Sequence, residues 1–234
     1  VRAASAVNVL KNLQKRSSVI GQGQNIENDL SRVTLPSQKK KGPLKLIVVG
    51  GNTGAQKSLA ALLESLPADT PPVVISVSTI SGFLPEFIQK LKSKMQVQLE
   101  VAKNETPLFM GHVYFCPTGS HGKIEARAQQ LMLRLEKGSP VCSQMPSSNV
   151  LFESAASVVS GGLCGVLLSG FGTDGVDGLK SVAGHGGFTL IENPETAQFP
   201  FAPQKALALG VVDQIFDSHE FAKVILDYRN RSAA

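Results

Sequence analysis

Three glycine-containing turns hold the polar residues best placed for chemistry. They cover residues 50–55, 76–82 and 169–175, and each follows a short apolar run. If these runs are parallel strands of one sheet, their carboxyl ends meet at the edge where α/β proteins bind ligands. We therefore expect the three turns to converge and to form the functional site.

The first turn, GGNTGA, partly matches the glycine-rich fingerprint of dinucleotide-binding proteins. Only Gly51 and Gly54 have the spacing of its last two glycines, and no acidic residue clearly ends the next apolar run. An incomplete glycine motif is weak evidence for nucleotide binding. Glycines that allow a tight strand-to-helix turn are the better interpretation, and no cofactor is expected.

The histidines and cysteines do not have the spacing of metal ligands. The chain has four histidines and three cysteines, and no group of them follows a zinc-binding pattern, so no metal is expected. Cys116, Cys142 and Cys164 are interpreted as buried free thiols of a protein in a reducing compartment. A surface or structural role is expected for each of the four histidines.

Two regions of different composition divide the chain. Residues 1–42 are rich in Ser, Gln, Asn and Lys and predict a linker or the tail of an upstream region. Residues 43–234 predict one domain, in which apolar runs alternate with helical patterns and short glycine connections. The predicted strands are residues 44–49, 73–77, 165–168 and 187–191.

This alternation predicts an α/β fold with a doubly wound, mostly parallel sheet and helices on both faces. In the middle third, residues 112–116 and 130–135 instead alternate apolar and polar side chains. Such alternation is typical of half-exposed antiparallel strands, so a small antiparallel flap is expected there.

The charge and hydropathy of the chain indicate which kinds of binding partner to expect. The net charge of +5 favours acidic partners through long-range attraction. The one basic cluster, residues 39–41, fits a solvated linker, and without Trp and with only two Tyr the chain is not expected to bind nucleic acid. No apolar stretch approaches the roughly 20 residues that span a bilayer, so we expect a soluble, cytoplasmic protein without membrane insertion.

Five segments share their order and much of their sequence with one known family. They read VVGGNTGA (48–55), STISGF (78–83), VYFCP (113–117, with His121 following), PSSNVLFESAA (146–156) and LSGFGTDG (168–175). Chance seldom matches several short motifs in order. On these motifs, residues 44–216 resemble the catalytic domain of the chemotaxis protein-glutamate methylesterase (CheB-type) family, whose corresponding turns read I-G-A-S-T-G-G, H-M-P-A-G-F and L-T-G-M-G-N-D-G.

The resemblance implies a hydrolase fold with an altered triad. The family hydrolyses methyl esters of glutamates, and deamidates glutamines, on the cytoplasmic helices of chemoreceptors with a Ser, His and Asp triad. In this chain the position of the serine holds Asn52 and that of the histidine holds Ser78. Only Asp174 matches the family.

Backbone N–H groups remain available as hydrogen-bond donors when the side chains of the site are replaced. The resemblance implies that the N–H groups of Thr53 and Phe171 form an oxyanion hole, and that His121 lies beside the site. Family members usually carry an upstream receiver domain, with which the segment 1–42 is compatible. Asp174 has an alternative, purely structural interpretation as the cap of the helix that it opens.

Acyl transfer needs an oxygen or sulfur nucleophile whose proton a nearby imidazole can take. The amide of Asn52 supplies no such nucleophile, and Ser78 has no evident base beside it. We therefore predict a methylesterase-like domain that has lost hydrolysis and binds a chemoreceptor or a signalling partner. The alternative is an active methylesterase and glutamine deamidase with a non-standard nucleophile.

Overall fold

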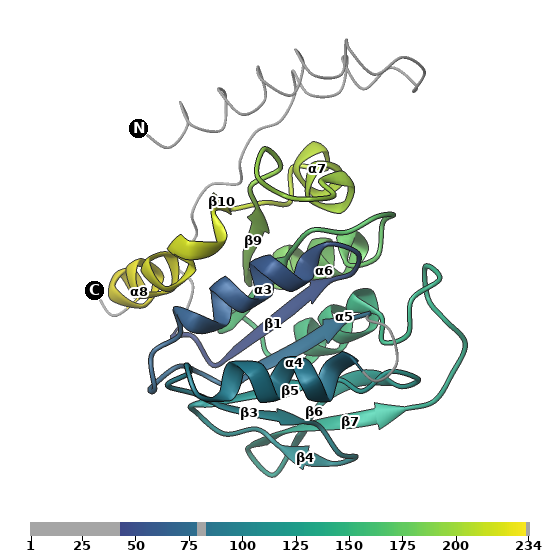
Figure 1. Cartoon of the computed structure of the whole chain (residues 1–234), viewed down its shortest axis with the longest axis vertical. Coiled ribbons are helices and arrows are strands. Elements are labelled where there is room, and N and C mark those ends of the chain that lie inside the picture. The colour runs from purple at the N-terminus through teal and green to yellow at the C-terminus, as the bar shows by residue number, and fades with distance from the viewer. Residues whose placement is uncertain (1–42, 79–82, 233–234) are drawn as a thin grey trace.

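The computed structural model describes residues 43–78 and 83–232. The linker expected for residues 1–42 lies outside this range. A seven-stranded parallel sheet runs through the domain in the order β10-β9-β8-β1-β2-β5-β3 (Figure 1). Its strands are β1 (Leu46–Gly51), β2 (Val73–Val77), β3 (Gln98–Val101), β5 (His112–Phe115), β8 (Leu163–Leu167), β9 (Phe188–Glu192) and β10 (Gln214–Phe216).

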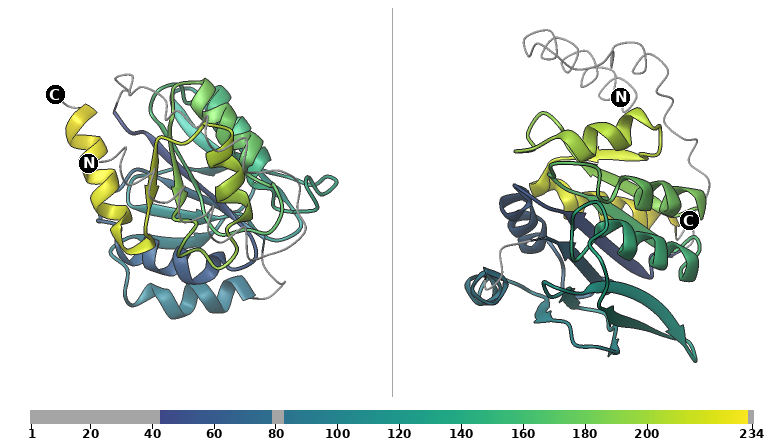
Figure 2. Two further views of the ribbon diagram at one scale, coloured as in Figure 1. Left: turned by 90° about the horizontal axis from the view of Figure 1, so that it is seen from above. Right: turned by 90° about the vertical axis from the view of Figure 1, so that its right-hand side faces the viewer.

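Helices cover both faces of this sheet (Figure 2). One face carries α3 (Ala55–Glu64), α4 (Phe83–Lys92) and α8 (Phe221–Ser232), and the other carries α5 (Ser148–Val158), α6 (Val176–Gly184) and α7 (Phe201–Ala208). In β1, Ile47 and Val49 point into the first core, whereas Leu46 and Val48 point into the second. Since each fully buried side chain of this size stabilises the fold by about 1.5–3 kcal/mol, β1 anchors both layers. The predicted doubly wound fold is confirmed.

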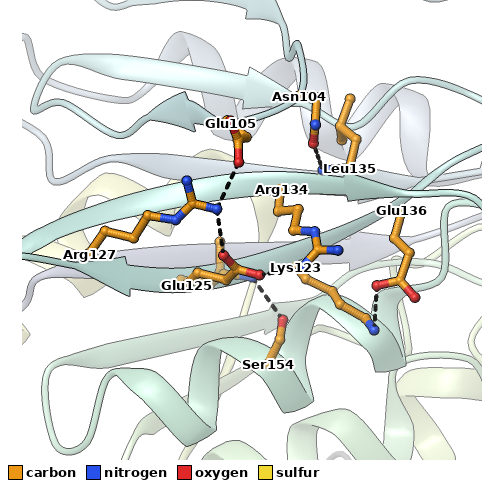
Figure 3. A network of polar contacts seen from close by, with 10 residues as sticks. Asn104, Glu105, Lys123, Glu125, Arg127, Arg134, Leu135, Glu136 and Ser154 are labelled. Carbon is orange, nitrogen blue, oxygen red and sulfur yellow. Dashed lines mark hydrogen bonds and ion pairs between the residues drawn. The ribbon is translucent and has the colours of Figure 1, made fainter.

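A small antiparallel sheet of β4 (Thr106–Pro107), β7 (Gln130–Glu136) and β6 (His121–Arg127) confirms the expected flap. Its inner side chains Ile124 and Leu133 are buried in the core that contains α5, and the N–H of Ile124 donates a 3.0 Å hydrogen bond to Ser154 Oγ on that helix. Figure 3 shows the outer face, where charged side chains of the flap and of the turn before β4 form ion pairs. Exposed pairs of this kind add little stability, so the apolar contacts fix the flap on α5. The pairs are Arg127 with Glu105 and Glu125, Arg134 with Glu125, and Lys123 with Glu136.

The prediction that residues 112–116 belong to the flap is wrong. They form β5 of the main sheet, which pairs in parallel with both β2 and β3. Val113, Tyr114 and Phe115 are all buried, so the apparent alternation came from the polar end of Tyr114. That hydroxyl accepts a 3.0 Å hydrogen bond from the N–H of Phe109, so it has a partner within the protein although Tyr114 is buried.

The prediction of three buried thiols also needs one correction. All three cysteines are free, and Cys116 and Cys164 are buried, but Cys142 is exposed. It lies in a turn between Val141 and Gln144, whose backbone groups bond each other. Burial raises the pKa of the Cys116 thiol to about 12 and keeps it protonated.

The strand order places a topological switch point at β1. The chain leaves β1 for β2 on one side and later returns to β8 on the other side. In open α/β sheets a ligand crevice forms outside the carboxyl ends of the strands at such a point. The first and third glycine turns follow β1 and β8. No helix in the described part of the chain is long and apolar enough to cross a membrane.

Candidate functional site

The three turns meet on one buried serine, Ser148, at the start of α5. Its Oγ accepts a hydrogen bond from the N–H of Gly51 (3.2 Å) and donates one to the carbonyl of Ser76 (3.1 Å). Its own N–H donates to Asp174 Oδ2 at 2.7 Å. The expected convergence is thus confirmed for the described parts of the turns, although the sequence analysis did not single out Ser148 as a site residue.

The close approach of Ser148 explains a glycine in β1. A Cβ on Gly50 would lie 2.6 Å from both the Cβ and the Oγ of Ser148 and 2.9 Å from the ring of Phe152. No side chain fits there, so Gly50 lets α5 pack directly on the strand. This packing brings the start of α5 to the carboxyl end of β1.

Asp174 is buried, with 3% of its surface exposed, and accepts three hydrogen bonds from the start of α5. Oδ1 accepts from the hydroxyl of Ser147 (2.5 Å) and the N–H of Asn149 (3.2 Å), and Oδ2 accepts from the N–H of Ser148. The N-terminal N–H groups of a helix lack partners within the helix and favour a negative charge. Asp174 therefore caps α5, and the prediction that it caps its own helix, α6, is wrong.

Asn149, in the first turn of α5, caps the start of the neighbouring helix α6. Its Oδ1 accepts hydrogen bonds from the N–H groups of Gly175 and Gly178, both at 2.9 Å, at the start of α6. Asp174, just before α6, therefore caps α5, and Asn149, on α5, caps α6.

His121 takes part in the same network but does not face the first turn through either ring nitrogen. Its Nδ1 accepts a hydrogen bond from the N–H of Ser147 (3.2 Å), so the proton resides on Nε2, which donates to the carbonyl of Ser139 (3.1 Å). The ring is buried, with 5% of the residue exposed. His121, Ser147 and Asp174 are thus connected, but the serine hydroxyl contacts the carboxylate and not the imidazole.

Asn52 joins the first turn to the third. Its Oδ1 accepts hydrogen bonds from the N–H of Thr53 (2.6 Å) and of Phe171 (2.7 Å). Its Nδ2 donates to the carbonyl of Phe171 at 3.0 Å. Only 3% of Asn52 is exposed. Ser78, at the end of the second turn's described part, is half-buried.

Glu192 is a site residue that the sequence analysis missed. It ends β9, is 2% exposed, and accepts a hydrogen bond from the N–H of Ser169 at Oε2 (2.7 Å) and another from the hydroxyl of Ser58 at Oε1. It therefore ties the third turn to α3. Burial raises the pKa of this carboxyl above its usual value. An acidic residue directly after the apolar run FTLI was the signal that could have revealed it.

Two exposed aromatic rings flank the turn that Asn52 holds. Phe171, with 62% of its surface exposed, packs edge-to-face on Phe201, with 51% exposed, at 5.0 Å between ring centroids. Large apolar side chains in water commonly mark contact surfaces when they are grouped. The pair adds a candidate contact surface beside the turns.

Comparison with known proteins identifies the family. The model of the family described as CheB methylesterase matches residues 47–225. The chain belongs to this family. It is 32% identical over 183 residues to the protein-glutamate methylesterase/protein-glutamine glutaminase of Bordetella pertussis, and 30% identical over 182 residues to that of Pectobacterium atrosepticum.

Both alignments cover 78% of this chain and 52% of the relative, so the chain spans about half the length of the curated relatives it matches. Its fold resembles the crystal structure of the CheB methylesterase catalytic domain from Thermotoga maritima. The TM-score is 0.76 at 23% identity, over 79% of this chain and 98% of that one. The seven-stranded sheet and the flap are therefore those of a CheB catalytic domain.

Replacing Asp174 by alanine should destabilise the fold, because three donors at the start of α5 lose their acceptor. We expect Asp174→Ala to lower the free energy of unfolding by about 2–3 kcal/mol, as measured by urea denaturation. Asp177→Ala is the matched control, since this exposed aspartate lies in the first turn of α6. It should cost less than about 1 kcal/mol, and equal losses in both variants would contradict the capping role.

Replacing Glu192 by glutamine should reduce the pH dependence of stability. Because the folded protein raises the pKa of Glu192 above 4.5, it binds this proton more tightly than the unfolded chain. The resulting stabilisation is complete below the unfolded pKa and is lost as the pH rises through the folded pKa. From about pH 5 to about pH 8, the free energy of unfolding should therefore fall more in the unaltered protein than in Glu192→Gln. Parallel pH profiles would refute this.

Proposed function

We propose that this domain belongs to a bacterial chemosensory system, has no hydrolytic turnover, and acts by binding the cytoplasmic helices of a chemoreceptor. The proposal follows from family membership combined with the residues at the triad positions. The relatives named above are methylesterases and glutaminases by name. In this chain Asn52 and Ser78 stand where the family resemblance places the nucleophile and the base.

The placement of the imidazoles carries the proposal. All four histidines lie in the described part of the chain, and none of them is among the hydrogen-bond partners of the Asn52 side chain. His121 is bonded at both nitrogens, and His112 starts β5, at the opposite end of the strands from the turns. His185 follows the end of α6, about 14 Å along the helix from its start. His219 lies in a short helical turn after β10, which is three strands from β1 in the sheet, and this turn packs against α3.

Without an imidazole, a hydroxyl near Asn52 has no base to take its proton. Loss of a triad nucleophile or base typically reduces turnover by about a million-fold. The surface beside the turns supports binding instead. The pair Phe171–Phe201 offers exposed aromatic anchors, which dominate many protein interfaces. The net positive charge, which favours the acidic, glutamate-rich helices of a receptor, comes from residues 1–42, because residues 43–234 hold 15 Lys and Arg against 16 Asp and Glu.

The double variant Asn52→Ser with Ser78→His tests the assignment of the triad positions. It should release methanol from a methylated receptor fragment about 100-fold or more faster than the unaltered protein, because nucleophile and base act as a unit. Each single change should have almost no effect. Asp174 accepts three hydrogen bonds and, as a carboxylate, has room for one more from the new imidazole.

Adding Asp174→Asn to the folded double variant should therefore remove most of the gain. A folded double variant without activity would contradict the assigned positions. Turnover by the unaltered protein at the level of a family enzyme would overturn the proposed function and favour an active enzyme with a non-standard nucleophile.

Receptor binding should depend on salt and on the aromatic pair. Calorimetry with a cytoplasmic receptor fragment should show binding that weakens as ionic strength rises, because salt screens exposed opposite charges. Phe171→Ala should weaken binding about tenfold, the scale of an interface anchor. Leu226→Ala, on α8 and also exposed, is the control and should not change the affinity. No heat of binding at low salt would refute receptor binding, and salt-independent binding would refute its electrostatic basis.

A further inference from the structure

The backbone donors assigned to the oxyanion hole already have an acceptor within the chain. The N–H groups of Thr53 and Phe171 point at Asn52 Oδ1 from 2.6 and 2.7 Å. Oxyanion-hole donors lie at about 2.7–3.1 Å from the oxygen that they stabilise. Asn52 Oδ1 thus occupies the position that the oxygen of a bound ester, amide or carboxylate would take.

The other atoms of the Asn52 carboxamide also have close contacts within the chain. Nδ2 donates to the carbonyl of Phe171, so one side chain satisfies both backbone groups of that residue. A Cβ on Gly170 would lie 3.0 Å from Oδ1, 3.3 Å from Cγ and 3.4 Å from Nδ2. The flat amide therefore lies directly against the bare Cα of Gly170, with 3% of Asn52 exposed to solvent.

We infer that Asn52 is a built-in occupant of the oxyanion hole, and that beneath it lies a binding site for a carboxylate or acyl oxygen. The inference deepens the proposed function and rests on it: the side chain that replaces the nucleophile also closes the hole. Even the modest catalysis that an open oxyanion hole retains without a triad is then suppressed.

A tethered occupant has a large advantage over a ligand from solution. Groups held in the right geometry within one molecule act at effective concentrations far above any that a free ligand reaches. A carboxylate could enter only if Asn52 rotated away, which would leave its buried amide without these partners. Removal of the side chain should therefore uncover the site, and its retention should keep the site closed.

Amide hydrogen exchange tests the occupancy in the unaltered protein. Thr53 and Phe171 are exposed residues of surface turns, and amides there exchange rapidly unless they are hydrogen-bonded. Both N–H groups should exchange about 100-fold more slowly than that of Gly172, whose N–H has no hydrogen bond among the described residues. Asn52→Ala should abolish this protection, and Asn104→Ala, the same change on the flap, should not.

Acetate titration tests the uncovered site. In Asn52→Ala, acetate should shift the amide resonances of Thr53 and Phe171 saturably, whereas in the unaltered protein and in Asn104→Ala it should not. If Asn52→Ala does not fold, Gly170→Ala keeps the amide but displaces it by a few tenths of an ångström. That variant should lower the protection of both amides about tenfold, because hydrogen bonds weaken as their geometry departs from the optimum.

Two results would overturn the inference. One is exchange of Thr53 and Phe171 as fast as that of Gly172 in the unaltered protein. The other is an equal response to acetate with and without the Asn52 side chain. Both readouts are independent of ester turnover. Protected amides in an active enzyme would therefore refute the proposed function alone, and unprotected amides in an inactive protein would refute the occupancy alone.

Discussion

The buried carboxylate of Asp174 is the contact on which the site depends. It holds the start of α5 through Ser147, Ser148 and Asn149, while Asn149 in return holds the start of α6. Because Ser148 then bonds Gly51 at the end of β1 and Ser76 near the end of β2, its position fixes where the carboxyl ends of the central strands meet. The geometry around Asn52 follows from this arrangement, since the turn that carries Asp174 also carries Phe171.

The architecture could be predicted because it depends on local patterns. Apolar runs followed by glycine turns predicted the parallel strands, and the motifs predicted the family, which the match over residues 47–225 confirms. The pattern failed at β5, where the buried hydroxyl of Tyr114 gave a false alternation. Burial on both faces depends on neighbours distant in sequence, so a run of five residues does not reveal it.

The contacts of the site were less predictable for a related reason. A sequence shows that Asp174 opens one helix, but not that another helix begins within hydrogen-bonding distance of it. The link from Glu192 to Ser58 spans 134 residues, and the link from Asn52 to Phe171 spans 119. Such partners depend on strand order, which places β1 beside β8 and β8 beside β9. The roles of Asn52, Ser78 and Asp174 in catalysis stay predictions.

The capping role of Asp174 has a consequence for how family members are sorted into active and inactive proteins. A residue that the fold needs is selected for stability whether or not any reaction depends on it. The aspartate of the triad would thus persist after the nucleophile and the base had been replaced, and its presence says nothing about activity. In this scaffold the informative positions are those of the nucleophile and the base, held here by Asn52 and Ser78, and a survey of relatives would gain most from comparing those two first.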